Sequence, residues 1–157
     1  MRHAPFLPML IGTGFGAGFC PVAPGTAGAL LAAVAWCLLS MALPAECLLW
    51  ITIGLILVFT LAGVWAANRL EAVWGEDPSR VVVDEMVGTW VALLAVSAGE
   101  WMWMLAALVL FRLFDIFKPL GIRRMENLPG GAGVMADDIL SGIYGLVVLL
   151  VLKWITA

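Results

Sequence analysis

The sequence predicts an all-α integral membrane protein, a polytopic helical bundle with about four to five membrane-embedded helices and cytoplasmic polar loops. Of its 157 residues, 64% are hydrophobic and only 12% are charged. The mean hydropathy is +1.08. A soluble domain carries roughly 25% charged residues, so this chain has too little polar surface to stay dissolved as a compact monomer. The length suits one domain, and we assign residues 1–157 to a single membrane-embedded unit.

The predicted helices follow apolar stretches of about the length that a bilayer core requires. In chain order, these stretches are residues 26–43, 47–67, 86–98, 101–111 and 139–155. A very short turn at Pro44 joins the first two into an antiparallel hairpin. The third and fourth are each shorter than a full span and meet around Gly99 and Glu100, so they form two short spans or one bent element. In the last stretch, Gly142 and Gly145 predict close helix packing.

The basic residues predict the orientation of the bundle. If the N-terminus is cytoplasmic and the spans alternate, seven of the eight basic residues face the cytoplasm. These seven are Arg2, Arg69, Arg80, Arg112, Lys118, Arg123 and Arg124. Lys153 lies near the opposite face, together with an aromatic belt made by Trp50, Trp101, Trp103 and Trp154.

Several function classes are excluded by what the sequence lacks. The net charge of −3 and the absence of a basic run argue against a nucleic-acid partner. The three cysteines form no C-x-x-C pair, so neither a disulfide framework nor a zinc site is predicted. Because His3 is the only histidine, catalysis by a histidine pair or a Ser-His-Asp triad is not expected.

Seven of the eleven carboxylates fall in two predicted cytoplasmic segments, residues 77–85 and 115–138. Asp84 and Glu85 directly precede an apolar run, where Asp84 either caps the helix or joins its neighbour in a functional pair. The segment that enters the last span carries three glycines before Asp137 and Asp138. Adjacent carboxylates favour a hard cation such as Mg²⁺, although a flexible loop with a helix cap is the alternative.

Two further segments carry candidate phosphate ligands. Arg112, Asp115 and Lys118 follow one another at intervals of three on a helix otherwise made of Leu and Phe. Charges at membrane depth are costly and indicate function, here phosphate binding by the cations and cation binding by the carboxylate. The glycine-rich residues 12–26 lead into a helix at Thr26, whose N–H groups could line a phosphate pocket. A re-entrant or interfacial segment that packs under the other helices is the alternative.

Four ordered motifs together resemble the phosphatidylglycerophosphatase A family of bacterial lipid phosphatases. They are G-x-G-x-G-x-x-P-x-x-P-G-T at residues 14–26, D-E-x-x-G at 84–88, F-R-x-x-D-x-x-K-P at 111–119 and G-G-x-G-x-M-x-D-D at 130–138. The resemblance implies a multi-pass, Mg²⁺-dependent enzyme at the cytoplasmic face of the bacterial inner membrane. Its reaction would hydrolyse phosphatidylglycerophosphate to phosphatidylglycerol and inorganic phosphate. It also implies functional roles for Asp84, Glu85, Arg112, Asp115, Lys118, Asp137 and Asp138.

From these residues we expect five carboxylates, Asp84, Glu85, Asp115, Asp137 and Asp138, to surround one or two Mg²⁺ ions. Arg112, Lys118 and Thr26 would bind the substrate phosphate, and either water or a carboxylate would attack it. Without cations these carboxylates would repel one another, so metal loss should loosen the cytoplasmic segments. The rival hypotheses are a small ion or proton-coupled transporter that uses Arg112 and Asp115, and a purely structural membrane subunit.

Overall fold

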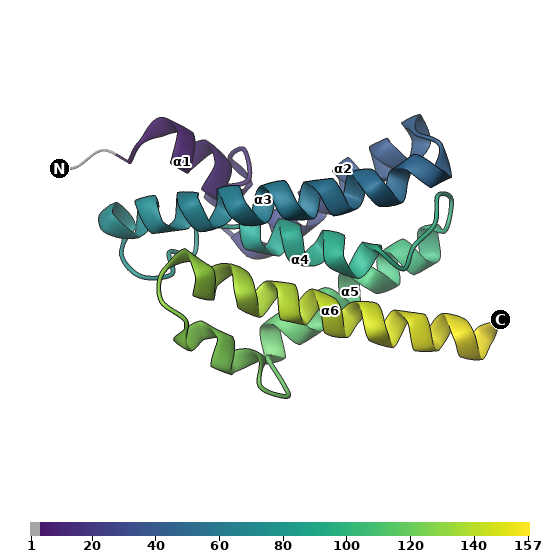
Figure 1. Ribbon diagram of the computed structural model, residues 1–157. Helices are drawn as coiled ribbons and strands as arrows, with labels where there is room; N and C mark the ends of the chain where they lie inside the picture. Colours follow the sequence, from purple (N-terminus) through teal and green to yellow (C-terminus); the bar gives the residue numbers. More distant parts are fainter. Residues whose placement is uncertain (1–3) are drawn as a thin grey trace.

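A computed structural model describes residues 4–157, and within them the chain is helical without a strand (Figure 1). Arg2 and His3, which enter the predictions above, lie outside the described residues. The α-helices are α1 (Phe6–Gly12), α2 (Pro24–Ala42), α3 (Ala45–Trp74), α4 (Val83–Leu93), α5 (Trp101–Phe117) and α6 (Gly131–Thr156). Two short 3₁₀ helices, η1 (Ala17–Phe19) and η2 (Ile122–Asn127), lie in the connections.

Successive long helices run in opposite directions, so each helix begins at the end of the bundle where the preceding one finishes (Figure 1). The starts of α4 and α6 and the ends of α3 and α5 lie at one end, which we call the polar end. The α2–α3 turn, the α4–α5 turn and the C-terminus lie at the other. The predicted hairpin is confirmed, because Pro44 separates α2 from α3. The basic residues from Arg69 to Arg124 therefore share the polar end, and Lys153 lies opposite, as predicted.

Three helices among the described residues are long and apolar enough to cross a membrane: α2, α3 and α6. Large apolar side chains on the outside of the bundle are exposed, for example Leu61 (75%) and Met102 (78%), as expected for contact with lipid. The two short apolar arms form separate helices, α4 with 11 residues and α5 with 17, so the single bent element is not found.

Helix α4 lies at the centre of the bundle, where it packs against α2, α3, α5 and α6. Every residue of α4 except Glu85 is buried. The indole Nε1 of Trp90 donates a hydrogen bond of 3.0 Å to Ala32 O, which links α4 to α2. A Cβ added to Gly142 of α6 would lie 2.4 Å from Gly88 O, so this crossing requires glycine. The predicted packing role of Gly142 is confirmed, and the crossing brings the first turn of α4 beside α6.

The N-terminal glycine-rich segment supports the start of α4. Helix α1 packs against α3 and is too short to span a bilayer. Gly12 O accepts a hydrogen bond of 2.8 Å from Val82 N, the residue that precedes α4. A Cβ on Gly18 would lie 2.0 Å from Arg80 O, so the glycine-rich segment also packs tightly against the loop before α4. This geometry agrees with the alternative of a segment that packs closely under the other helices.

Three sequence-predicted boundaries differ from the structure. Val82 occupies the N-cap position of α4, so Asp84 lies within the first turn and the capping alternative is wrong. Helix α6 begins at Gly131, which places Asp137 and Asp138 on its second turn and contradicts the flexible loop. Helix α3 continues to Trp74, past the predicted end of its apolar stretch, because its last two turns pack against neighbours at the polar end.

Candidate active site

A cavity of about 320 Å³ opens at the polar end, between the start of α2, the loop before α4, and helices α4, α5 and α6. All seven charged residues that the sequence predicts for the site line this cavity. They are Asp84, Glu85, Arg112, Asp115, Lys118, Asp137 and Asp138. The remaining lining includes Ala23, Pro24 and Gly25 at the start of α2. Thr26 lies one residue further along the same turn and does not line the cavity.

The site is assembled from separate helices, and each helix contributes side chains that lie on one of its faces. Asp84 and Glu85 occupy the first turn of α4, and Asp137 and Asp138 occupy the second turn of α6. Arg112 and Asp115 lie three residues apart near the end of α5, and therefore share one face of it. No single segment holds the set, so the site exists only when the bundle is formed.

The five carboxylates form two groups that share Asp138. One group joins Asp84, Glu85 and Asp138, and the other joins Asp115, Asp137 and Asp138. Within each group, one oxygen of every carboxylate lies within 4.8 Å of the others. Two adjoining sets of oxygen ligands are the kind of arrangement that hard divalent cations prefer.

Buried polar atoms without partners test whether these residues fit a cation. Within residues 4–157, no hydrogen-bond partner exists for Asp84 Oδ1, Glu85 Oε2, Asp137 Oδ1, Asp138 Oδ2 and Arg112 Nε. Asp84 is 8% exposed, Asp137 6% and Asp138 2%. Burial of an unpaired carboxylate is costly, and charges in protein interiors are normally paired or bind metals. The donor set therefore fits a divalent cation.

Arg112 lies on the side of the cavity that α2 closes. Its Nη1 donates to Asp115 Oδ2 one turn further along α5. Gly25 packs closely against Glu85 and Arg112, since a Cβ at this position would lie 2.2 Å from Glu85 Oε1 and 3.3 Å from Arg112 Nη1. Asp115 thus orients the guanidinium, and Gly25 lets the first turn of α2 approach it.

Lys118 ends α5 and holds the opposite side of the cavity. The backbone is left-handed there (φ 45°), and the N–H of Lys118 still donates to Phe114 O. Its Nζ donates hydrogen bonds to Asp137 Oδ2 (2.5 Å) and Glu126 Oε1 (2.6 Å). Burial by itself would lower the pKa of Lys118, but these two carboxylates outweigh it and raise the pKa above its ordinary value. The ammonium group therefore stays protonated across the physiological range.

The structure adds residues that the sequence analysis did not assign. Asp77 and Ser79, in the loop before α4, also line the cavity. Glu126 on η2 joins the site through its ion pair with Lys118. Asn68 Oδ1 on α3 accepts a hydrogen bond of 2.7 Å from Gly131 N and so positions the start of α6. Asp77 and Glu126 both fall within the acidic segments recognised in the sequence, whereas nothing local marks Asn68, whose partner is distant in the chain.

Comparisons with known proteins agree with this geometry. A family model described as phosphatidylglycerophosphatase A matches residues 10–153. A Bacteroides thetaiotaomicron protein provisionally named a phosphatidylinositol-3-phosphatase is 59% identical over 157 residues, which cover 99% of each chain. Two proteins named phosphatidylglycerophosphatase A are each 36% identical. The Escherichia coli protein aligns over 85% of this chain and 76% of its own length, and the Haemophilus influenzae protein over 92% and 88%. No solved structure matches the chain.

Proposed function

Because the chain belongs to the phosphatidylglycerophosphatase A family, we propose that it hydrolyses the terminal phosphomonoester of phosphatidylglycerophosphate, releasing phosphatidylglycerol and inorganic phosphate. The observation that carries this proposal is the convergence of the five predicted carboxylates, a sixth at Asp77, one arginine and one lysine on a single cavity at one end of a membrane bundle. Carboxylates with a divalent cation and basic side chains are the usual equipment for phosphoryl transfer.

We further propose that the two carboxylate groups hold Mg²⁺, with Asp138 shared between them. When bound, the cation would neutralise phosphate charge and lower the pKa of a coordinated water. The unpartnered buried oxygens of Asp84, Glu85 and Asp137 support this assignment, because each needs a counter-charge.

The protein's own groups then bind and orient the phosphate. Arg112 can hold two phosphate oxygens with its planar guanidinium, while Asp115 keeps that group in place. Lys118 adds a fixed positive charge on the other side, and the first turn of α2 presents its backbone near Gly25. The phosphorus would be attacked in line either by water, deprotonated by a neighbouring carboxylate, or by the carboxylate of Asp115 itself. On the water route, the ester P–O bond breaks, and the lipid alkoxide takes up the proton that the attacking water lost, so that phosphatidylglycerol and inorganic phosphate are released. On the carboxylate route, the alkoxide takes its proton from water, and a second water then hydrolyses the phosphoaspartyl group to inorganic phosphate.

The lipid would reach the cavity from the side that α2 and α5 border. Val22, just before α2, is 77% exposed and Phe117, at the end of α5, is 69% exposed. Such apolar side chains suit acyl chains that remain in the leaflet while the headgroup enters beside Arg112. We assign the polar end to the cytoplasmic face of the bacterial inner membrane because it carries the basic residues. The clustering of charges at one end suits surface chemistry better than the rival transport pathway.

Phosphatidylinositol-3-phosphate is a second candidate substrate, favoured by the name of the 59% identical relative. Both lipids present a phosphomonoester on a hydroxylated headgroup, so the same cation and basic groups would act on either. Comparison of the two substrates therefore belongs in the first assay.

The test is phosphate release from each lipid in mixed micelles, with Mg²⁺ or a chelator. Asp138→Asn removes the carboxylate shared by both groups, and Glu46→Gln is a matched control at the far end of α3. We expect Mg²⁺-dependent release from phosphatidylglycerophosphate, a loss of at least about 100-fold in Asp138→Asn, and full activity in Glu46→Gln. Faster release from phosphatidylinositol-3-phosphate would reassign the substrate. Release unaffected by chelation would refute the metal proposal.

A further inference from the structure

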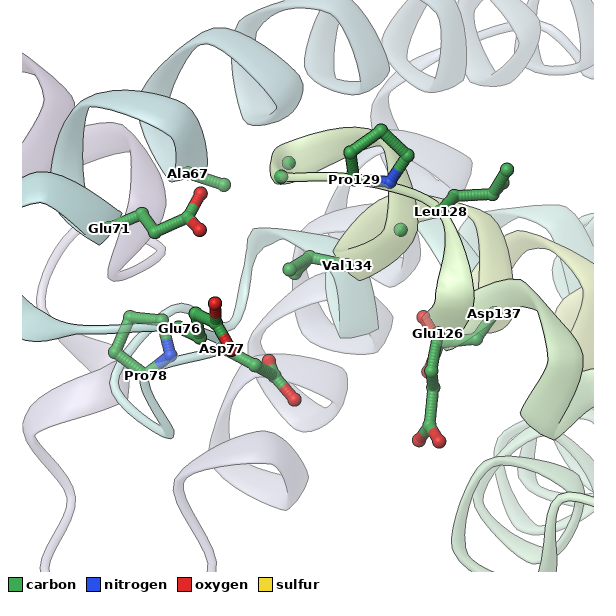
Figure 2. Close-up of a pocket in the computed structure, with 13 residues that line it drawn as sticks. Ala67, Glu71, Glu76, Asp77, Pro78, Glu126, Leu128, Pro129, Val134 and Asp137 are labelled. Atoms are coloured by element: carbon green, nitrogen blue, oxygen red, sulfur yellow. The ribbon is translucent and has the colours of Figure 1, made fainter.

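A second cavity, of about 260 Å³, lies at the polar end between the end of α3, the loop before α4 and the start of α6 (Figure 2). Glu71, Glu76 and Asp77 lie on one side of it, and Glu126 and Asp137 lie on the other. We call this cavity, with these five carboxylates, the acidic vestibule. The predicted mechanism makes no use of Glu71 or Glu76.

The acidic vestibule adjoins the candidate active site. Asp77, Val134 and Asp137 line both cavities and form their common wall. Asp137 is buried, with only 6% of its surface exposed, and its Oδ1 has no hydrogen-bond partner within residues 4–157. An unpartnered carboxylate oxygen therefore stands between the acidic vestibule and the deeper carboxylate groups.

The charge of the acidic vestibule selects what can enter it. Across the described part of the chain, Glu71, Glu76 and Asp77 have no ion-pair partner, and Glu126 is paired only with Lys118. A concave surface lined by one sign of charge concentrates counter-ions and raises their rate of arrival. The same field repels a phosphomonoester, whereas the candidate active site has Arg112 and Lys118 in its lining to attract one.

The size of the acidic vestibule suits a cation that keeps its water. Mg²⁺ dehydrates reluctantly and prefers six oxygen ligands in octahedral geometry. Six waters at about 30 Å³ each occupy about 180 Å³, which is less than the volume of the cavity. Oxygen acceptors on both sides can hold the hydrated ion before its waters are exchanged for the carboxylates of the deeper site.

We propose that the acidic vestibule is the entry route by which a hydrated divalent cation reaches the carboxylate groups around Asp138. This inference rests on the proposed metal-dependent function and adds that the cation and the lipid reach the site by different routes. The cation enters from the aqueous side past Glu71 and Glu76, and the lipid enters from the membrane side past Arg112.

The experiment measures how fast Mn²⁺ binds to the purified full-length protein in detergent. Stopped-flow quenching of tryptophan fluorescence gives the association rate, and electron paramagnetic resonance of free Mn²⁺ gives the binding stoichiometry. The test variants are the double variant Glu71→Gln/Glu76→Gln and the single variant Glu76→Lys, whose position is exposed and therefore tolerates a charged side chain. Glu46→Gln is the matched control, an exposed carboxylate at the opposite end of the helix that carries Glu71. Asp138→Asn provides the background for quenching unrelated to the deeper site.

We expect the association rate constant to fall about tenfold in the double variant and in Glu76→Lys, since steering by charge contributes at least that much. In these variants the association rate constant should also decrease less steeply with rising ionic strength, while Glu46→Gln behaves as wild type. Equal rates and equal salt dependence in wild type and both test variants would overturn the entry route alone. Failure of wild type to bind Mn²⁺ would overturn it together with the proposed metal requirement.

Discussion

Gly25 illustrates how one residue controls the geometry of the candidate site. It lies in the first turn of α2, where the backbone touches both Glu85 of α4 and Arg112 of α5. Any side chain there must displace the carboxylate or the guanidinium, because these two groups leave no space for a Cβ. The glycine therefore serves close approach between α2 and the charged groups rather than backbone flexibility.

We predict that Gly25→Ala lowers phosphatase activity by about 100-fold, the effect expected when reacting groups are misplaced by about 1 Å. The added Cβ would lie 2.2 Å from Glu85 Oε1, so that carboxylate must move. Gly54→Ala on α3 is the matched control, because a Cβ at Gly54 meets nothing within 4 Å. Phosphate release by the two purified variants decides the matter, and equal activities would contradict the role given to Gly25.

Helix α6 is fastened at both of its ends by side chains from other elements. Asn68 of α3 accepts a hydrogen bond from its first residue, Gly131. At the other end, Lys153 Nζ donates to Glu100 Oε2 (2.5 Å) and Ala95 O (3.0 Å) in the α4–α5 turn. The same Glu100 oxygen accepts a hydrogen bond of 2.7 Å from Ser97 N. These contacts hold α6 in the register that places Asp137 and Asp138 at the site.

The ion pair between Glu100 and Lys153 predicts a pH dependence of stability. Its hydrogen bonds to Lys153 and Ser97 lower the pKa of Glu100 below the ordinary value of 4.5. The folded pKa is depressed, so the stabilisation is complete above pH 4.5 and is lost as the pH falls through the folded pKa. We expect Glu100→Gln to lower the free energy of unfolding by at most about 1 kcal/mol at neutral pH, because exposed ion pairs are screened.

Thermal unfolding in detergent from pH 7 to pH 3 would measure this difference. The gap in Tm between wild type and Glu100→Gln should close at the acidic end of the range. Glu46→Gln removes an exposed carboxylate that has no ion-pair partner among residues 4–157, so this variant should show no gap. A gap that stays constant with pH would contradict the prediction.

The whole molecule concentrates its chemistry at one end and leaves its sides apolar. Five carboxylates on α4, α5 and α6 face one another there, balanced within the described residues only by Arg112 and Lys118. Like charges at such distances repel, and a bound cation would relieve that repulsion. The bundle should therefore be tighter at its polar end when a divalent cation is present.

Limited trypsin digestion would measure this coupling, because Arg123 and Arg124 on η2 are exposed. We expect a chelator to speed cleavage after these residues several-fold relative to protein in Mg²⁺, since repulsion opens the connection to α6. Chymotryptic cleavage after Trp154, at the other end of α6, is the internal control and should not change. Identical tryptic rates in both buffers would count against a cation at the site.

The sequence by itself determined the membrane class, the helical fold and the charged residues of the site. Composition and apolar stretches suffice for the first two, because a bilayer demands long apolar helices irrespective of how they pack. The charged residues stood out because, in so apolar a chain, a cluster of carboxylates held near the membrane is costly and therefore indicates a function. All seven charged candidates line one cavity as a result.

Only the tertiary structure decided how these residues divide into groups and what lies beside them. The sharing of Asp138 between two carboxylate groups depends on the crossing of α4 and α6 at Gly88 and Gly142. The sequence predicts close packing at Gly142 but does not specify that α4 is the partner helix. The role of Asn68 likewise arises from a partner that is distant in the chain. Helix periodicity predicts which side chains share a face, but the choice of facing helices is made by packing between small residues.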